Sequence, residues 1–172
     1  PFRADHRTND YIEGNAWQYL WMVPHQPYEL ISMLGGDETF VRRLDEFFAL
    51  PSELDAEASN DISGLIGQYA HGNEPSHHVT YLYTFAGKPW KTAEKVREIM
   101  DKFYTARPDG LIGNEDVGQM SAWYILSSLG FYPANPLSGE FVFGSPLVEK
   151  ATLKIGEDKT FRVTVKNNSR EN

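Results

Sequence analysis

The chain has 172 residues, 41% of them hydrophobic, and its 16 Lys and Arg against 24 Asp and Glu give a formal net charge of −8 at pH 7. This composition predicts one ordinary core, and neither a basic cluster nor an apolar run of membrane-spanning length is present, so we expect neither nucleic acid nor a membrane as a partner. The absence of cysteine excludes disulfides, thiolate metal sites and thiol chemistry.

The first three quarters of the chain have the spacing of helices. Apolar residues recur every three or four positions, and Pro or Gly separates the segments. The clearest helix follows Asp37, which can cap it. Its apolar face comprises Phe40, Val41, Leu44, Phe47 and Phe48. In chain order the predicted helices span residues 17–23, 27–34, 37–50, 75–86, 88–104 and 120–129.

The pattern changes near Pro133, and from residue 141 onward polar and apolar residues alternate as they do in strands. Strands are predicted at 141–143, 151–155 and 160–165, and the link at 156–159 joins the last two into a hairpin. A lone hairpin is marginally stable in water, so we expect it to pack on a sheet or domain outside this chain. The prediction is therefore a helical part at 1–134 and trailing strands at 135–172.

Three polar segments lie at the starts of predicted helices. They read YIEGNAWQY at 11–19, GNEPSHH at 72–78 and GNEDVGQM at 113–120, and each combines a carboxylate with an Asn and a Gly. Helices that deliver such segments at one end suggest a bundle or toroid of helical hairpins whose rim builds a pocket.

Two carboxylates in these segments suit acid–base chemistry. A glycosidase needs one carboxylic acid to protonate the leaving oxygen and a second carboxylate either to attack or to activate water. Glu13 and Asp116 fit such a pair. Either residue alone is more simply explained as a helix-start carboxylate, since Asp and Glu are common there, and only their joint occurrence favours catalysis.

The middle segment favours a hard metal ion over zinc. His77 and His78 are adjacent, and adjacent helical side chains point about 100° apart, whereas helical zinc ligands lie four residues apart. Asn73, Glu74 and backbone carbonyls offer oxygen, which suits calcium. The two histidines could equally be helix-start residues bonded to neighbouring backbone.

In sequence and in order along the chain, the three segments closely resemble motifs of glycoside hydrolase family 92, the calcium-dependent exo-α-mannosidases. The similarity continues through GFYP at 130–133 and GSPL at 144–147, so it covers nearly the whole chain. The resemblance implies an (α/α)6 toroid, of which this chain is the C-terminal part. It also implies an N-terminal β-sandwich domain of the same enzyme that lies outside this chain.

The resemblance implies roles for individual residues. Glu13 corresponds to the general acid and Asp116 to the general base. The implied calcium ligands are Asn73, Glu74 and backbone oxygen near Gly72. The implied sugar contacts are Trp17, His77, His78, Glu115 and Gln119. Many relatives carry an acidic residue where this chain has Asn114, which leaves Asp116 as the strong base candidate.

The implied reaction is calcium-dependent, inverting removal of terminal α-mannose from glycans, with α-1,2 linkages as the commonest substrate. Relatives that digest glycans act outside the cytoplasm, so we expect a secreted, periplasmic or cell-surface enzyme whose signal peptide would precede this segment. Two alternatives stay open. They are a carbohydrate-binding or non-catalytic fragment, and an (α/α) toroid glycosidase that acts on another sugar.

Overall fold

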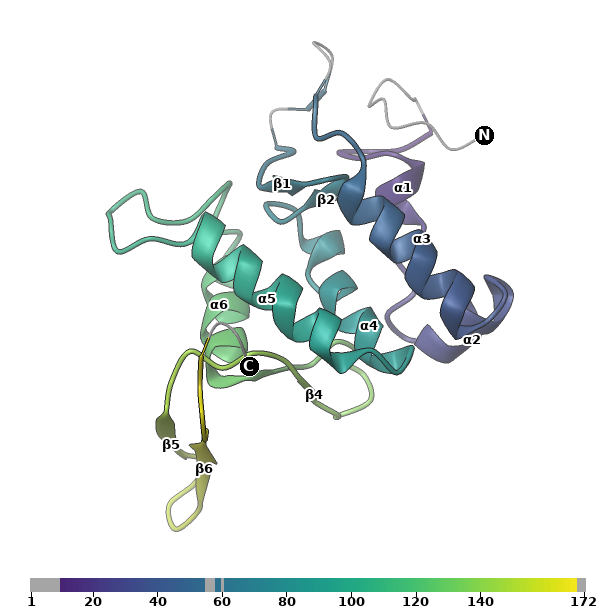
Figure 1. Cartoon of the computed structure of the whole chain (residues 1–172). Helices are drawn as coiled ribbons and strands as arrows, with labels where there is room; N and C mark the ends of the chain where they lie inside the picture. The colour runs from purple at the N-terminus through teal and green to yellow at the C-terminus, as the bar shows by residue number, and fades with distance from the viewer. Residues whose placement is uncertain (1–9, 55–57, 60, 170–172) are drawn as a thin grey trace.

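The computed structural model describes residues 10–54, 58–59 and 61–169 and is mainly helical, with three short antiparallel strand pairs (Figure 1). The helical elements are α1 (Ala16–Tyr19), α2 (Pro27–Met33), α3 (Asp37–Ala49), the 3₁₀ turns η1 (Glu74–Ser76) and η2 (Val79–Tyr81), α4 (Leu82–Phe85), α5 (Pro89–Phe103) and α6 (Gln119–Leu129). The strand pairs are β1 (Leu65–Ile66) with β2 (Tyr69–Ala70), β3 (Phe131–Tyr132) with β4 (Val142–Phe143), and β5 (Lys150–Lys154) with β6 (Thr160–Thr164). The prediction of a mainly helical chain with a short C-terminal β segment is confirmed.

The inner face of α3 builds much of the core. All five apolar residues predicted for this face are buried, as the spacing of three and four residues requires. Trp21 has none of its surface exposed and packs edge-on against Phe40, with ring centroids 5.4 Å apart. It also lies 5.7 Å from the ring of Phe47. Burial of each such side chain contributes about 2–3 kcal/mol to folding.

The long helix α5 starts at Pro89, whose missing N–H costs nothing at the first helical position. Its buried stripe includes Val96, Ile99 and Met100. Asp45 on α3 joins this helix to α4, because it accepts bonds from Lys91 Nζ at 2.7 Å and from the Tyr83 hydroxyl at 2.8 Å. The three helices are thus linked at one point.

The predicted helix at 75–86 is wrong, because η1, η2 and α4 replace it. The amide of His77 bonds to Glu74 O and that of Tyr81 to His78 O, both at 3.0 Å and both three residues back. The imidazoles of His77 and His78 are buried and bond to the main-chain oxygens of His71 and Trp21, and these contacts fix the backbone against its helical propensity.

The first predicted helix is shorter than expected and ends at Tyr19. Beyond it, the amide of Trp21 bonds to Gln18 O and that of Met22 to Tyr19 O, three residues back. Such tight turns lead the chain to Pro24, before which a regular helix is disfavoured.

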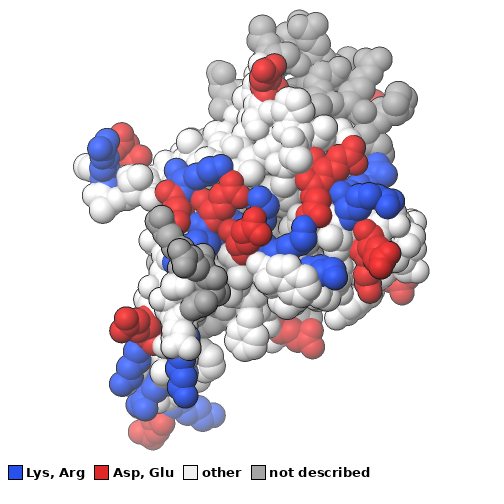
Figure 2. All heavy atoms as spheres, in the orientation of Figure 1, with Lys and Arg blue, Asp and Glu red and all other residues white. Residues whose placement is uncertain are grey.

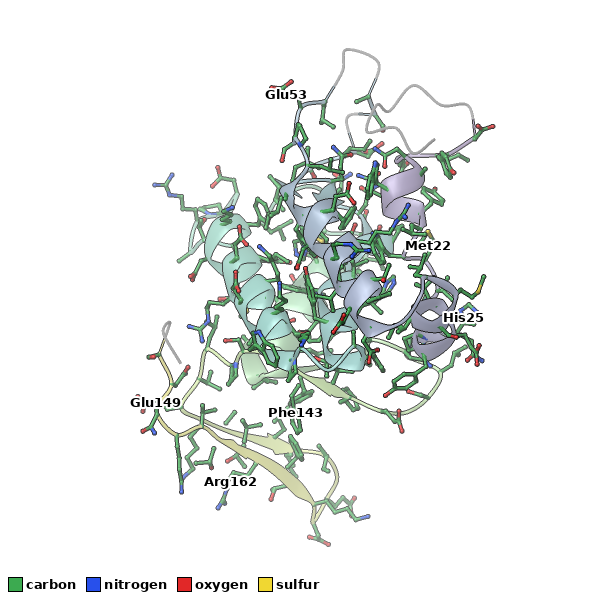
Figure 3. All side chains as sticks on the ribbon, turned by 45° about the vertical axis from the view of Figure 1, so that its right-hand side comes forward. Met22, His25, Glu53, Phe143, Glu149 and Arg162 are labelled. Carbon is green, nitrogen blue, oxygen red and sulfur yellow. The ribbon has the colours of Figure 1, made fainter. Side chains whose placement is uncertain are left out.

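The C-terminal hairpin forms as predicted, with β5 and β6 paired from Lys150 opposite Thr164 to Lys154 opposite Thr160. Arg97 on α5 holds its base, donating to Pro146 O at 2.7 Å and to Asn168 Oδ1 at 3.3 Å. The rest projects from the helical part (Figure 1). Figure 3 shows Glu149 and Arg162 on the hairpin, far from Met22 and His25 near α2. Its packing on a sheet outside this chain, and the boundary at residue 134, stay predictions.

Acidic and basic side chains are interspersed over much of the face in Figure 2, with several basic ones on the hairpin. Within the described ranges, no helix combines the length and the apolar character needed to cross a membrane.

Strands β1 and β2, which the sequence did not predict because two residues show no alternation, are joined by a turn that rests on the end of α3. The amide of Gln68 in this turn donates to Phe47 O at 2.9 Å. Gly67 has a positive φ of 60°, and a Cβ there would collide with the main chain of Phe47 and Phe48.

We predict that Gly67→Ala destabilises the fold by about 2 kcal/mol more than Gly87→Ala, measured by denaturant unfolding. Gly87 is a matched control, since its φ is 71° but a Cβ there would meet nothing within 4 Å. Equal losses would mean that the turn does not press on α3.

Candidate active site

The three polar segments meet in the structure. Asn73 Nδ2 donates to the backbone carbonyl of Glu13 at 3.0 Å, which joins the middle segment to the first. The carboxyl groups of Glu74 and Asp116 lie close enough for Asp116 to raise the pKa of Glu74, which brings the middle segment beside the third. The segment at 72–74 therefore contacts both proposed catalytic residues.

The cap of α1 holds Glu13 in place. Asn15 is fully buried, and its Oδ1 accepts the amides of Trp17 at 3.0 Å and Gln18 at 3.3 Å, while Gln18 Oε1 accepts the amide of Asn15 at 2.9 Å. Asn15 Nδ2 also donates to Gln68 Oε1 at 2.8 Å, in the β1–β2 turn. The cap leaves Glu13 exposed, at a φ of 53°.

Asp116 lies in a strained turn just before α6. It has a φ of 51° and Val117 a φ of 56°, both in the left-handed region, which costs about 1–2 kcal/mol for each such residue. Both side chains are exposed. Three of the four non-glycine residues with positive φ in the described part of the chain are thus Glu13, Asp116 and Val117. Strain of this kind gathers at functional sites.

Gly72 and Gly113 allow the middle and third segments to approach backbone to backbone. A Cβ on Gly113 would lie 3.2 Å from Gly72 Cα and 2.7 Å from Ser63 Oγ, and a Cβ on Gly72 would collide with the same hydroxyl oxygen. Neither position has room for a side chain. Their glycines therefore set the spacing between Glu74 and Asp116.

The carboxylates of this site affect one another. Burial raises the pKa of Glu74, and the hydrogen bond and negative charge of Asp116 and the charge of Glu13 raise it further. The hydrogen bond from the backbone amide of Glu74 to its own carboxylate lowers this pKa. Three acidic side chains from three segments thus share one electrostatic environment.

His77 is neutral and has a defined tautomer. Its Nε2 lies 2.9 Å from the carbonyl oxygen of His71, which can only accept, so Nε2 carries the proton. Its Nδ1 then accepts from Gln119 Nε2 at 3.1 Å, and the same amide group donates to the Tyr132 hydroxyl at 3.3 Å. Burial lowers the pKa of His77 to about 4.

A cavity of about 300 Å³ opens beside this network. Its wall includes Glu74, His77, His78, Gln119, Trp123 and Tyr132. The structure thus places three of the five predicted sugar contacts around one cavity, together with a predicted calcium ligand. The imidazole of His78 also bonds through Nε2 to Trp21 O at 2.6 Å.

The other two predicted sugar contacts are placed differently. Trp17 belongs to the core, with 7% of its surface exposed and the guanidinium of Arg43 5.6 Å from its ring centroid. Glu115 directs its carboxylate to Ser121 at the start of α6. Neither residue contributes to the wall of the cavity.

A buried histidine that the sequence did not reveal lies beneath the site. The Tyr104 hydroxyl donates to Met120 O at 3.1 Å, so His71 Nε2 donates to that hydroxyl at 2.7 Å, and His71 Nδ1 accepts from the Tyr69 hydroxyl at 2.8 Å. Burial lowers its pKa well below the usual range. Its partners at positions 69 and 104 lie far apart in sequence, so no motif marks it.

The oxygen atoms of the middle segment fit a hard cation. Asn73 uses its side-chain nitrogen for Glu13, and its side-chain oxygen Oδ1 has no hydrogen-bond partner among the described residues. Glu74 adds a carboxylate, and Gly72 O accepts no backbone bond in the same ranges. No three His, Asp or Glu side chains come together as a metal cluster in the described part, so any ion here needs amide and backbone oxygens or ligands from outside the chain.

The sequence model of the glycosyl hydrolase family 92 catalytic domain matches residues 1–172, the whole length of the chain. The chain belongs to this family. Its family 92 membership makes it part of a glycoside hydrolase catalytic domain of the α-mannosidase family.

Solved family 92 structures agree. The α-mannosidase BT3965 from Bacteroides thetaiotaomicron, in complex with mannoimidazole, is 41% identical with a TM-score of 0.91, over 100% of this chain and 24% of that one. The inverting mannosidase BT2199 from the same species is 38% identical with a TM-score of 0.80, over 99% and 24%. An uncharacterised secreted glycosidase from Arthroderma benhamiae is 29% identical over 86% of this chain and 17% of its own. This family 92 chain thus spans about a quarter of the solved relatives.

We predict that the free energy of unfolding decreases as the pH is lowered, because of the buried histidines. Burial lowers the pKa of His71, His77 and His78, so the unfolded chain, with histidine pKa values near ~6.5, binds more protons than the folded one. Stability is therefore full above ~6.5 and declines as pH falls toward the folded-state values. For His77 alone the loss reaches about 3 kcal/mol near pH 4.

The measurement is the free energy of unfolding in urea between pH 7.5 and pH 4.5. His77→Gln should flatten this dependence, whereas His25→Gln, at an exposed position, should leave it unchanged. An unchanged slope in His77→Gln would contradict the prediction.

Proposed function

We propose that this chain is the C-terminal part of the (α/α)6 catalytic domain of a calcium-dependent, inverting exo-α-mannosidase. The observation that carries the proposal is that, in a chain of family 92, Asn73 bonds to the main chain of Glu13 while Asp116 and Glu13 both raise the pKa of Glu74. Glycoside hydrolysis needs a pair of carboxyl groups, and Glu13 and Asp116 supply one beside Glu74.

Glu13 is the proposed general acid and Asp116 the proposed general base. Asp116 removes a proton from a water molecule that attacks the anomeric carbon, while Glu13 protonates the departing glycosidic oxygen from the other side. Inversion requires room for that water, so the two carboxyl groups should stand roughly 6.5–9.5 Å apart in the substrate complex. BT2199, described as an inverting mannosidase, supports this stereochemistry.

Calcium is the proposed cofactor, with Asn73, Glu74 and the carbonyl oxygen of Gly72 as ligands from this chain. Oxygen donors suit this hard cation, and its preference for six to eight of them leaves positions for substrate and for residues outside the chain. When bound, the ion supplies Lewis-acid and template chemistry to the cis 2- and 3-hydroxyls of mannose.

The cavity beside His77 is the proposed sugar pocket. Neutral His77 holds Gln119, and the two side chains together with His78 would contact mannose from the helical side. The other two residues that the resemblance implies as sugar contacts, Trp17 and Glu115, lie outside the cavity wall, and a buried Trp17 would act by supporting the segment of Glu13. The mannose analogue bound to BT3965 supports a mannose-like ligand.

The substrate is proposed to be a glycan with terminal α-mannose, α-1,2-linked in the first instance. The rest of the toroid and an N-terminal β-sandwich domain of the same enzyme would close the pocket, since this chain spans only about a quarter of its solved relatives. The fungal relative described as secreted supports a secreted, periplasmic or cell-surface location.

The acid and base roles predict large losses of turnover in a longer enzyme, by which we mean this chain together with the rest of its catalytic domain. Asp116→Asn and Glu13→Gln should each lower kcat by roughly 10²–10⁴-fold on α-mannobiose, because each removes a proton transfer. Glu13→Gln should lose less on an aryl mannoside with an activated leaving group. Glu38→Gln, an exposed carboxylate on α3, is the control. A near-wild-type rate for Asp116→Asn would contradict the assignment of Asp116 as the general base.

The calcium proposal predicts loss of activity after treatment with EDTA and its return when calcium is added. Zinc should not restore the rate, because the donors are oxygens. Glu74→Gln should raise the calcium concentration needed for half-maximal activity by at least roughly 10-fold. Indifference to chelation would favour a toroid glycosidase that acts on another sugar.

A further inference from the structure

The carboxylate of Glu115 is fully engaged by one residue of α6. Its Oε1 accepts the amide of Ser121 at 2.9 Å, and its Oε2 accepts the Ser121 hydroxyl at 2.7 Å. These two bonds connect the segment that carries Asp116 to the first turn of the helix. Two main-chain bonds reinforce the connection, from Met120 N to Glu115 O at 3.2 Å and from Gln119 N to Asp116 O at 3.1 Å.

The connection replaces a missing helix cap. The N-cap residue of α6 is Gly118, which has no side chain to accept the first amides. Glu115 takes over this task for Ser121, and its negative charge suits the positive end of the helix. In agreement, the bonds from Ser121 lower the pKa of Glu115, so the residue stays ionised.

The strained turn next to Glu115 needs such support. Asp116 and Val117 both have positive φ, and their side chains are exposed, so packing does little to hold them. The bonded residues on either side, Glu115 and Gln119, are the fixed points of the turn. Release of one of them would let the backbone relax and turn the carboxylate of Asp116 away from its place beside Glu74.

We propose that Glu115 and Ser121 are a positioning pair that holds Asp116 in its orientation for catalysis. The proposal rests on Asp116 as the general base. Glu115 then acts through the main chain of its neighbour, and it is neither a second base nor a contact to the sugar. Direct contact with sugar would require it to give up its bonds to Ser121.

Four variants of the longer enzyme test the pair. Glu115→Ala should lower kcat by roughly 10–100-fold, as misplacement of a reacting group does, with KM changed by less than about 3-fold. Ser121→Ala keeps the amide bond and should lose roughly 3–10-fold. The double variant should be no slower than Glu115→Ala, because both changes remove the same contact.

Glu115→Gln is the decisive conservative change. Its carbonyl oxygen can accept the Ser121 amide and its NH₂ can donate to the Ser121 hydroxyl oxygen, so both bonds survive without the charge. We expect kcat within about 3-fold of wild type. If Gln is as damaging as Ala, Glu115 acts through its charge on the reaction and the positioning role is overturned. A silent Ser121→Ala, or a double variant whose loss is the product of the two single losses, also overturns it.

Two substrates separate a misplaced base from general damage. Activation of water is required whatever the leaving group, so Glu115→Ala should lose the same factor on α-mannobiose and on an activated aryl mannoside. A loss confined to α-mannobiose would point to Glu13 instead and contradict the proposal. Binding of mannoimidazole, measured by calorimetry, should change by less than about 3-fold, which verifies that the variants are folded.

The controls separate this proposal from the proposed function. Glu98→Ala removes a carboxylate of α5 that is bonded to Lys95 and Lys102, and it should leave kcat unchanged. If Asp116→Asn is active, or if the wild-type enzyme cleaves no mannoside, the proposed function fails and the positioning role with it. If Asp116→Asn is inactive but Glu115→Ala has the wild-type rate, only the positioning role fails.

Discussion

The contact on which the site depends is the close approach of the middle polar segment to both outer ones. A Cβ on Gly113 would lie 3.2 Å from Gly72 Cα, and a Cβ on Gly72 would collide with Ser63. One residue further on, Asn73 bonds to the main chain of Glu13. Because these are short backbone contacts, they leave little freedom in the relative positions of the segments. The carboxylates of Glu74, the proposed metal ligand, and Asp116, the proposed base, can then project from fixed main chain, which is the preorganisation that such a site needs.

The residues that would do the chemistry are the ones held under strain. Glu13 and Asp116 both have positive φ, and each is followed by a helix. A side chain accepts hydrogen bonds from the first turn of that helix, Asn15 for α1 and Glu115 for α6. These hydrogen bonds offset a strain of about 1–2 kcal/mol per residue. The two carboxylates are exposed and their backbone is strained, whereas the residues that hold them are less exposed and hydrogen-bonded. Functional sites commonly combine strained residues with a surrounding structure that fixes them.

The sequence was sufficient where a single element carries the signal. The apolar stripe of α3, the α5 helix and the C-terminal hairpin follow from periodicity. The sequence was insufficient at 75–86, where hydrogen bonds from His77 and His78 to the carbonyl oxygens of His71 and Trp21 override helix propensity. It also missed the link from His71 to Tyr104, since a contact across 33 residues leaves no local pattern. The hydrogen bonds between Glu115 and Ser121 were missed for a different reason, because an acidic residue beside a proposed base is readily interpreted as part of the reaction.

The histidines beneath the site explain why a cation suits it. Burial lowers the pKa of His71, His77 and His78, so these three imidazoles supply no positive charge at neutral pH to the carboxylates above them. Burial raises the pKa of Glu74, and the negative charges of Asp116 and Glu13 raise it further, so these carboxylates repel one another. A proton on Glu74 that hydrogen-bonds to Asp116 would relieve the repulsion, but it would occupy the carboxylate that we propose as the base. A divalent ion at Glu74 and Asn73 would relieve the same repulsion and leave Asp116 available as the base, so the metal proposal and the base proposal support each other.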